Sequence, residues 1–268
     1  MLVSELERAL LRRFPACDAE PWDHIGLSVG RPADEVHGVC CALDADAPAV
    51  RETARRGANV LLTHHPVYIS APDAFTPGEP GRASSGAAVF AAAEAGVSIV
   101  SLHTNLDRSQ EARELLAGLA GMTALGSLEH PDEPGLPGLG ALCDADGSLL
   151  DELASRLAAA FGCAPRVWGS AASPVRRCAL MGGSLGDFGE LAIAAGADAV
   201  VAGEAGYHVA RDLALRGCAV VLLGHDRSEE PFTHILADAA IAAGIGRDRI
   251  DTIQTAVPWR TMTERGTL

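Results

Sequence analysis

Short runs of β-branched and aliphatic residues alternate along the chain with longer segments in which apolar positions recur at helical spacing. Apolar runs of about four to eight residues between turn formers predict buried strands, and the longer periodic segments predict helices. Strands are expected at 36–43, 59–63, 98–102, 177–181, 199–202 and 219–223. Helices are expected at 1–13, 47–56, 84–95, 109–119, 149–161, 187–195, 209–216 and 232–243. This repeated order of strand and helix predicts an α/β fold.

Residues 126–140 are rich in Pro and Gly, unlike the periodic segments on either side. Clusters of such turn-forming residues are typical of loops and linkers. The strands and helices before and after this segment follow a similar rhythm. We therefore expect two similar α/β domains, one formed by residues 1–125 and the other by residues 126–268.

Polar side chains follow the apolar run in four of the expected strands, in the segments 61–66, 99–107, 200–204 and 220–225. In open α/β sheets the ligand site lies beyond the carboxyl ends of the strands, so these segments are expected to converge on one site. Five of the nine histidines fall in strand-end or loop segments: His24, His64, His65, His103 and His225. A shared site explains this distribution better than chance does.

The residue types at these strand ends suit metal ions. His64 and His65 are neighbours at the end of a strand, where side chains alternate in direction, so they can address two separate points. Asp107 and Glu229 each lie four residues beyond a histidine and offer carboxylates that can bridge two ions. Such a set suits two divalent cations with open positions for water, for which hydrolysis is the natural chemistry. Because these residues come from both sides of the linker, we expect the metal site between the two domains.

The glycine-rich turn at 182–187 contains Ser184 and has two interpretations. It is either a tight structural turn or a loop whose backbone N–H groups face a substrate anion. The turn does not match the GxSxG pattern of a nucleophile elbow, and a chain without Lys has no Walker A motif. Both interpretations of Ser184 stay open at this point.

Four polar or aromatic residues near the expected strands also have structural explanations. Trp22 and Asp23 either anchor the core and cap a loop or support the site. Asp44 and Asp46 precede the Pro-containing start of the expected helix at 47–56. Asp before such a start is typical of an N-cap, so both are expected to cap this helix.

Composition restricts the partners and the compartment. The chain has 268 residues, of which 48% are hydrophobic, and a net charge of −14, which excludes disorder and argues against nucleic acid as a partner. Its seven cysteines include no CxxC pair and fit a reduced cytoplasm. The first 13 residues predict an amphipathic helix and no signal peptide. No apolar stretch reaches the roughly 18 to 20 residues that a membrane span needs.

Five short segments, taken together, resemble the dinuclear-metal hexameric proteins of the NGG-one-interacting-factor-three-like family, often labelled GTP cyclohydrolase I type 2 homologues. They occur in the family's order and span almost the whole chain: Glu20 to Gly30 (EPWDHIGLSVG), Thr63 to Pro66 (THHP), His103 to Asp107 (HTNLD), Gly203-Glu204 with Tyr207-His208, and Gly224-His225 with Glu229. The resemblance implies a two-domain α/β fold, an internal site with two divalent metal ions per chain, and a ring-like homohexamer. The short segment at 126–140 predicts no third domain inserted between the halves.

The resemblance also implies roles for individual residues. The metal ligands would be His64, His65, Asp107, His225 and Glu229. Residues beside the ligands or on the substrate side would be His24, His103, Ser184, Glu204 and His208. Two departures from the family pattern are His24, where Asn is usual, and Ser228 before Glu229, where Thr is usual. The identity of the metal stays open among Zn, Mn, Fe, Co and Ni.

Two functions from different classes fit these residues. The first is a metal-dependent hydrolase of a small phosphorylated or nucleotide-like molecule. The family label implies GTP, but nothing in the sequence specifies a pocket for guanine. The second is a non-catalytic hexameric scaffold that stores or delivers metal ions. A hydrolase needs metal-bound water that solvent can reach, whereas a storage site can be closed.

Overall fold

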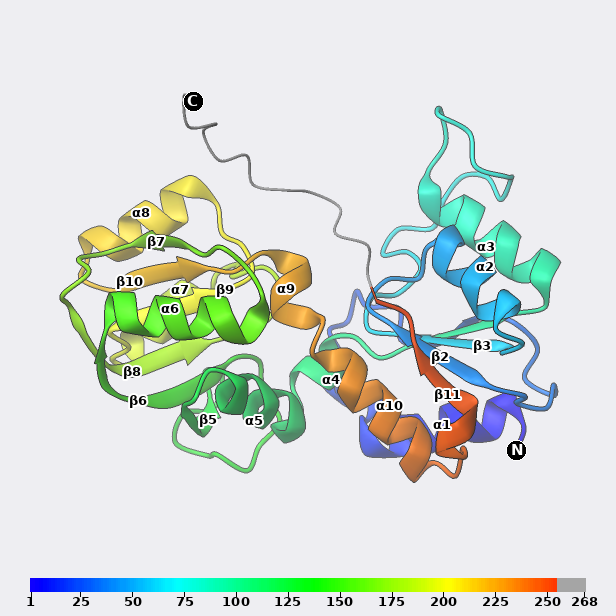
Figure 1. Ribbon diagram of the computed structural model, residues 1–268, viewed down its shortest axis with the longest axis horizontal. Coiled ribbons are helices and arrows are strands. Elements are labelled where there is room, and N and C mark those ends of the chain that lie inside the picture. Colours follow the sequence, from blue (N-terminus) through cyan, green and yellow to red (C-terminus); the bar gives the residue numbers. More distant parts are fainter. Residues whose placement is uncertain (255–268) are drawn as a thin grey trace, which may run out of the picture.

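The strands form two sheets, one in each lobe of the molecule (Figure 1). The structure is a computed structural model that describes residues 1–254. In the first sheet, of order β1-β4-β3-β2-β11, β1 runs antiparallel to β4 and the other neighbours are parallel. Its strands are β1 (Gly26–Val29), β2 (Val39–Ala42), β3 (Val60–Thr63), β4 (Ser98–Ser101) and β11 (Ile250–Thr252). Every residue of β2, β3 and β4 is buried, which explains their continuous apolar runs.

The second sheet has the order β5-β6-β8-β9-β10-β7. Its central strands β8, β9 and β10 are parallel to one another. The antiparallel pairs are β5 with β6, β6 with β8, and β7 with β10. The strands are β5 (Thr123–Ser127), β6 (Ala141–Leu149), β7 (Arg166–Trp168), β8 (Pro174–Leu180), β9 (Ala199–Ala202) and β10 (Ala219–Leu222). Two sheets with helices confirm the predicted α/β class.

The helices begin and end where local chemistry favours it. Asp46 caps α2, because its carboxylate accepts from the Ala49 N–H at 2.7 Å, and the left-handed Gly96 ends α3. Within residues 1–254, no helix combines the length and the apolar character needed to cross a membrane. The helices are α1 (Val3–Arg13), α2 (Ala47–Arg55), α3 (Ser84–Ala95), α4 (Thr104–Asp107), α5 (Gln110–Leu119), α6 (Leu150–Phe161), α7 (Phe188–Ala194), α8 (Tyr207–Leu215), α9 (His225–Glu229) and α10 (Phe232–Ala242).

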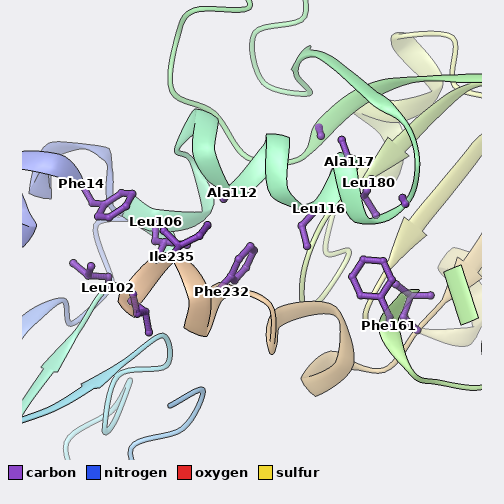
Figure 2. Close-up of a cluster of buried hydrophobic side chains, with 14 of the residues drawn as sticks. Phe14, Leu102, Leu106, Ala112, Leu116, Ala117, Phe161, Leu180, Phe232 and Ile235 are labelled. Carbon is purple, nitrogen blue, oxygen red and sulfur yellow. The ribbon is translucent and has the colours of Figure 1, made fainter. Parts of the chain in front are cut away.

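One hydrophobic cluster runs through both lobes. Figure 2 follows it from Phe14 and Leu102 in the first lobe, through Phe232 of α10, to Leu116 and Phe161 in the second. The short helices α4 and α9 lie where the lobes meet (Figure 1). Because packed interiors deform little, this shared core fixes the two sheets relative to each other and holds the residues between them in place.

The chain crosses between the lobes differently from the sequence expectation. All six expected strands and all eight expected helices are present within a few residues, but the expected boundary at 125–126 falls inside β5. Residues 128–140 connect β5 to β6 within the second sheet, and α10 leads back to β11, which pairs with β2 of the first sheet. A turn-rich composition marks a loop but not whether that loop joins two domains or two neighbouring strands. Residues 255–268 of the expected second domain lie outside the described part of the chain.

Candidate metal centre

Three strands, two from the first sheet and one from the second, lead into segments whose polar residues lie between the sheets. His64 and His65 follow β3, His103 and Asp107 follow β4, and α9 follows β10 and carries the remaining candidates. The bend after β3 is held by Thr63, whose hydroxyl donates to the His65 carbonyl at 2.7 Å. The predicted convergence of strand ends is therefore present, and it draws on both sheets.

The carboxylate of Glu229 lies at the middle of this group. Its Oε2 is 2.9 Å from His65 Nε2 and 3.1 Å from His225 Nε2, while its Oε1 is 3.8 Å from His64 Nε2. Asp107 Oδ1 is 3.4 Å from the same His64 nitrogen. Ligands of one cation, bound at about 2.0–2.2 Å, lie roughly 3 to 4 Å apart, so these spacings fit shared cations.

In residues 1–254, three groups of side chains hold ligand atoms within 4.8 Å of one another and could bind a metal ion. They are His64 with Asp107 and Glu229, His65 with His225 and Glu229, and His64 with His65 and His103. Glu229 belongs to two of these groups and presents a different oxygen to each. The arrangement could therefore hold more than one cation, with Glu229 between them.

The Nε2 atom of His64 is a buried ligand atom without a hydrogen-bond partner. The side chain is 0% exposed, and its Nδ1 donates to the Leu102 carbonyl at 3.0 Å, because a carbonyl oxygen can only accept. In a neutral ring this leaves the lone pair of Nε2 directed at the cluster. An unpaired buried polar atom is costly, and a cation at this position would satisfy it.

Three other histidines of the cluster also use Nδ1 for a hydrogen bond that orients the ring, and the acceptor in each case is a carboxylate. His65 Nδ1 donates to Asp44 Oδ1 at 2.8 Å, and His225 Nδ1 to Glu204 Oε1 at 3.0 Å. Histidines that bind metals usually donate their second ring N–H to an oxygen, which fixes the tautomer and the ring plane. The third such pair is His103 Nδ1 with Asp23 Oδ1, at 2.9 Å.

The electrostatics of the cluster favour positive charge. Burial lowers the pKa of His65, but hydrogen bonds to Asp44 and Glu229 outweigh it and raise that pKa to about 10. The hydrogen bond to Glu229 raises the pKa of His225 to about 9. Burial raises the pKa of Glu229, but hydrogen bonds from the surrounding histidines hold it well below its usual range. A metal cation would supply the positive charge that these carboxylates favour.

The turn at 182–187 has a structural reason for its glycines. Gly183 has a φ of +59°, and a Cβ there would lie 2.3 Å from Glu229 Oε1. The N–H groups of Gly183 and Leu185 already donate to Ser228 Oγ and to the Glu204 carbonyl, at 2.9 and 2.8 Å. The turn therefore makes room for Glu229, which favours the structural interpretation over an anion loop.

The structure places the remaining candidates in different surroundings. Glu204 contacts His225, and Ser184 lies on the wall of a cavity beside the cluster. His24 packs against the Tyr68 ring, with centroids 5.4 Å apart, and is in none of the three ligand groups. His208 is exposed at the start of α8, against the ring of Tyr207.

The structure corrects the expected role of Asp44 and decides between the two interpretations of Asp23. Asp44, expected as a helix cap, accepts instead from His65, and only Asp46 caps α2. Asp23 has a side chain that is 0% exposed, and it accepts from His103 and Thr104, so it supports the site. Asp44 follows β2 at the same sheet edge as His64 and His65, and the strand-end rule, applied to β2, could have found it.

Two cavities reach the cluster. The first, of about 490 Å³, has His103, Asp107, His225 and Glu229 on its wall. The second, of about 760 Å³, is bordered by His65 and His225 and by three carboxylates, those of Asp44, Glu204 and Asp226. The centre can therefore be reached from two sides.

The sequence model of the Duf34/NIF3 (NGG1p interacting factor 3) family matches residues 1–246. The chain is 31% identical over 213 residues to the "GTP cyclohydrolase 1 type 2 homolog" of Streptomyces coelicolor, which covers 77% of this chain and 73% of that protein. It is 25% identical over 222 residues to the protein of the same name from Clostridium acetobutylicum, with 81% of each chain covered.

Two solved structures share the fold. The Bacillus cereus protein related to NIF3 superposes with a TM-score of 0.85 at 19% identity, covering 98% of this chain and 99% of that one. Reduced HcgD from Methanocaldococcus jannaschii superposes with a TM-score of 0.74 at 22% identity, covering 95% and 97%. At these identities the structures show a common two-lobed α/β fold and nothing about ligands.

Proposed function

The chain belongs to the Duf34/NIF3 family, and from this premise we propose that it binds two divalent metal ions per chain and acts as a metal-dependent hydrolase of a small molecule. The observation that carries the proposal is the position of Glu229. One oxygen faces His65 and His225, and the other faces His64 and Asp107. A carboxylate shared in this way is suited to bridge two cations.

The proposed ligands divide into two sets around Glu229. His64 and Asp107 would hold one ion, and His65 and His225 the other. When bound, a pair of divalent ions supplies Lewis acidity and lowers the pKa of water. Asp44 and Glu204 keep the rings of His65 and His225 turned toward the ions, which preorganises the site. Imidazole and carboxylate ligands suit first-row divalent ions, among them Zn, Mn, Fe, Co and Ni.

Hydrolysis is favoured over storage by access to the centre. His225 is 39% exposed, and both cavities lead to it. A hydrolytic centre needs such access for water and substrate. The name of the Streptomyces coelicolor relative states homology to a GTP cyclohydrolase and is no evidence of GTP hydrolysis by this chain.

A second candidate function is metal storage or delivery. The carboxylates of Asp44, Glu204 and Asp226 border the larger cavity and would attract cations toward His65 and His225. A protein of this function would release its ions to an acceptor and would hydrolyse nothing. The two candidate functions use the same metal ligands, but only the hydrolase would turn over a substrate.

We further propose that the chain assembles into a homohexamer and works in the cytoplasm. Exposed apolar side chains on α7 and α8, among them Leu191, Val209 and Leu215, support a subunit interface. All seven cysteines are free, which supports a reducing compartment. Light scattering of the purified protein tests the assembly, and a monomer would overturn it.

The function is tested by elemental analysis of protein purified without chelators, followed by a screen against uncharged esters and amides as well as phosphoesters and nucleotides. We expect two divalent ions per chain and turnover of at least one substrate, lost in His64→Ala. Two bound ions without turnover of any substrate would favour storage or delivery. Trace metal after reconstitution at neutral pH would overturn both candidates.

A further inference from the structure

The smaller of the two cavities is of a size typical of small-molecule sites. It measures about 490 Å³, within the range of about 300 to 1,000 Å³ usual for such pockets. Its wall includes His103, Asp107, His225 and Glu229. A molecule held in this cavity would therefore have one end at the proposed metal ions.

The wall away from the metal centre is mostly apolar. Leu116 of α5, Met181 after β8 and Phe188 of α7 line it. Two further rings of the wall lie closer to the centre: Phe232 of α10 packs against His64, with centroids 4.9 Å apart, and Trp22 packs against His103, with centroids 6.0 Å apart. These side chains come from both lobes. Aromatic rings on such a wall favour planar or branched apolar groups through burial and ring packing.

The charged groups on this wall outside the metal centre are already paired. Arg113 is buried, and its guanidinium donates to the backbone carbonyls of Arg108, Leu136 and Gly138 at 2.7 to 3.2 Å. Glu20 accepts from Arg108. Among the described residues of the wall, Arg113 is the one arginine, so the protein offers no free guanidinium to a bound anion here.

We propose that this cavity is the substrate site and that it takes an uncharged small molecule, with an aromatic or branched apolar body and one polar group directed at the metal ions. The proposal rests on the metal centre proposed above and names its substrate class. It excludes nucleoside triphosphates as substrates.

A triphosphate fits this wall poorly. The metal ions could meet one phosphoryl group, but the remaining oxyanions would lie against Met181, Phe188 and the Glu20 carboxylate. Burial of a charged group without a partner is strongly unfavourable. Nucleotide-binding sites usually offset this cost with basic side chains or free backbone N–H groups.

The first experiment probes the cavity independently of the metal. N-phenyl-1-naphthylamine, an uncharged fluorophore, is titrated into chelator-treated and zinc-loaded protein. We expect one binding site for the probe per chain in both forms, because none of the proposed metal ligands belongs to the apolar part of the wall. Trp22→Ala and Phe188→Ala should each raise the dissociation constant about tenfold, because each removes an aromatic contact with the probe. GTP at millimolar concentration should not displace the probe.

Phe75→Ala is the matched control. Phe75 is 51% exposed, as Trp22 is 52% exposed, but it lies outside the wall of this cavity. Its substitution should leave probe binding unchanged. Equal loss in all three variants, no binding at all, or displacement by micromolar GTP would overturn the proposal. None of these results depends on whether the chain binds metal.

The second experiment tests the orientation of the bound molecule. Benzohydroxamate and acetohydroxamate carry the same metal-binding group, and only the first carries a ring. Zinc-loaded protein should bind benzohydroxamate about tenfold more tightly, and Phe188→Ala should remove that difference while acetohydroxamate binding persists. Equal affinities would overturn the substrate class with the metal centre intact. A chain that binds no zinc would overturn the proposed function, and the first experiment would still decide the occupant of the cavity.

Discussion

His65 Nε2 and Glu229 Oε2 lie 2.9 Å apart, although 164 residues separate them in the chain. His65 follows β3 of the first sheet, and Glu229 ends α9, the short helix that follows β10 of the second sheet. The contact therefore joins the two lobes at the proposed metal centre. Metal binding at this point is expected to stabilise the whole fold, since a ligand bound only by the native state shifts the unfolding equilibrium.

Replacing Glu229 should disturb both proposed ions. Glu229→Gln keeps the size of the side chain but removes the charge shared by the two ligand sets, and a neutral amide does not bridge two cations as a carboxylate does. Elemental analysis should show a fall from two ions per chain to one or none. Glu94→Gln, on the exposed side of α3, is the control and should keep both ions. Retention of two tightly held ions by Glu229→Gln would contradict the bridging role.

Asp44 and Asp46 provide a matched pair only two residues apart. Asp44→Asn weakens the acceptor that orients His65, so metal affinity should fall about 10- to 100-fold, the usual effect at such positions. Asp46→Asn should leave metal affinity unchanged, because Asn caps a helix about as well as Asp. Competition with a metal-binding dye measures both affinities. Equal affinities in the two variants would show that Asp44 does not orient a ligand.

Gly183 should matter to metal binding although it carries no ligand. Gly183→Ala adds a Cβ at 2.3 Å from Glu229 Oε1, at a left-handed φ of +59°. We expect displacement of Glu229 and loss of metal, which calorimetric titration with zinc would detect. Gly186→Ala shares the strain of a positive φ, +50°, but meets nothing within 4 Å, so it should keep its metal. Wild-type zinc binding by Gly183→Ala would mean that the turn yields to the added methyl group.

Glu129 should stabilise the protein in a manner that depends on pH. Burial raises its pKa, but hydrogen bonds from Arg108, at 2.9 and 3.1 Å, and from the Leu139 N–H hold that pKa below its usual value. A lowered carboxyl pKa contributes stability above its unfolded-state value of about 4.3. This contribution is lost as the pH falls through the lowered pKa.

Glu129→Gln should therefore cost about 1 to 3 kcal/mol of unfolding free energy at pH 7, with the difference from wild type shrinking below about pH 4. Urea denaturation at several pH values measures it. Glu133→Gln, on the exposed part of the same loop, should have little effect. A difference for Glu129→Gln that stays constant down to pH 3 would exclude a role for its charge.

The sequence predicted the buried parallel strands well, because strands enclosed on both faces have continuous apolar runs. Strands such as β5 and β7 were missed, since they are partly exposed and their short sequences have no clear period. The return of α10 and β11 to the first sheet was missed for a different reason. Which sheet a strand joins depends on packing between distant segments, and local periodicity does not report it.

The sequence predicted which residue types form the candidate site better than it predicted which side chains contact one another. The strand-end rule predicted that His64, His65 and Asp107 lie close together, and in the structure His64 shares one potential ligand group with His65 and another with Asp107. The rule also predicted that the segment containing His103 lies there, but it did not show that Asp44 orients His65. That relationship depends on side-chain directions, which strand order alone does not fix.

A crystal structure of the zinc-loaded protein with anomalous scattering tests the central claim most directly. Two anomalous peaks per chain are expected, about 3.5 to 4 Å apart, with the Glu229 carboxylate between them. One peak would lie beside His64 and Asp107, and the other beside His65 and His225. A single peak, or two peaks away from Glu229, would contradict the proposed centre.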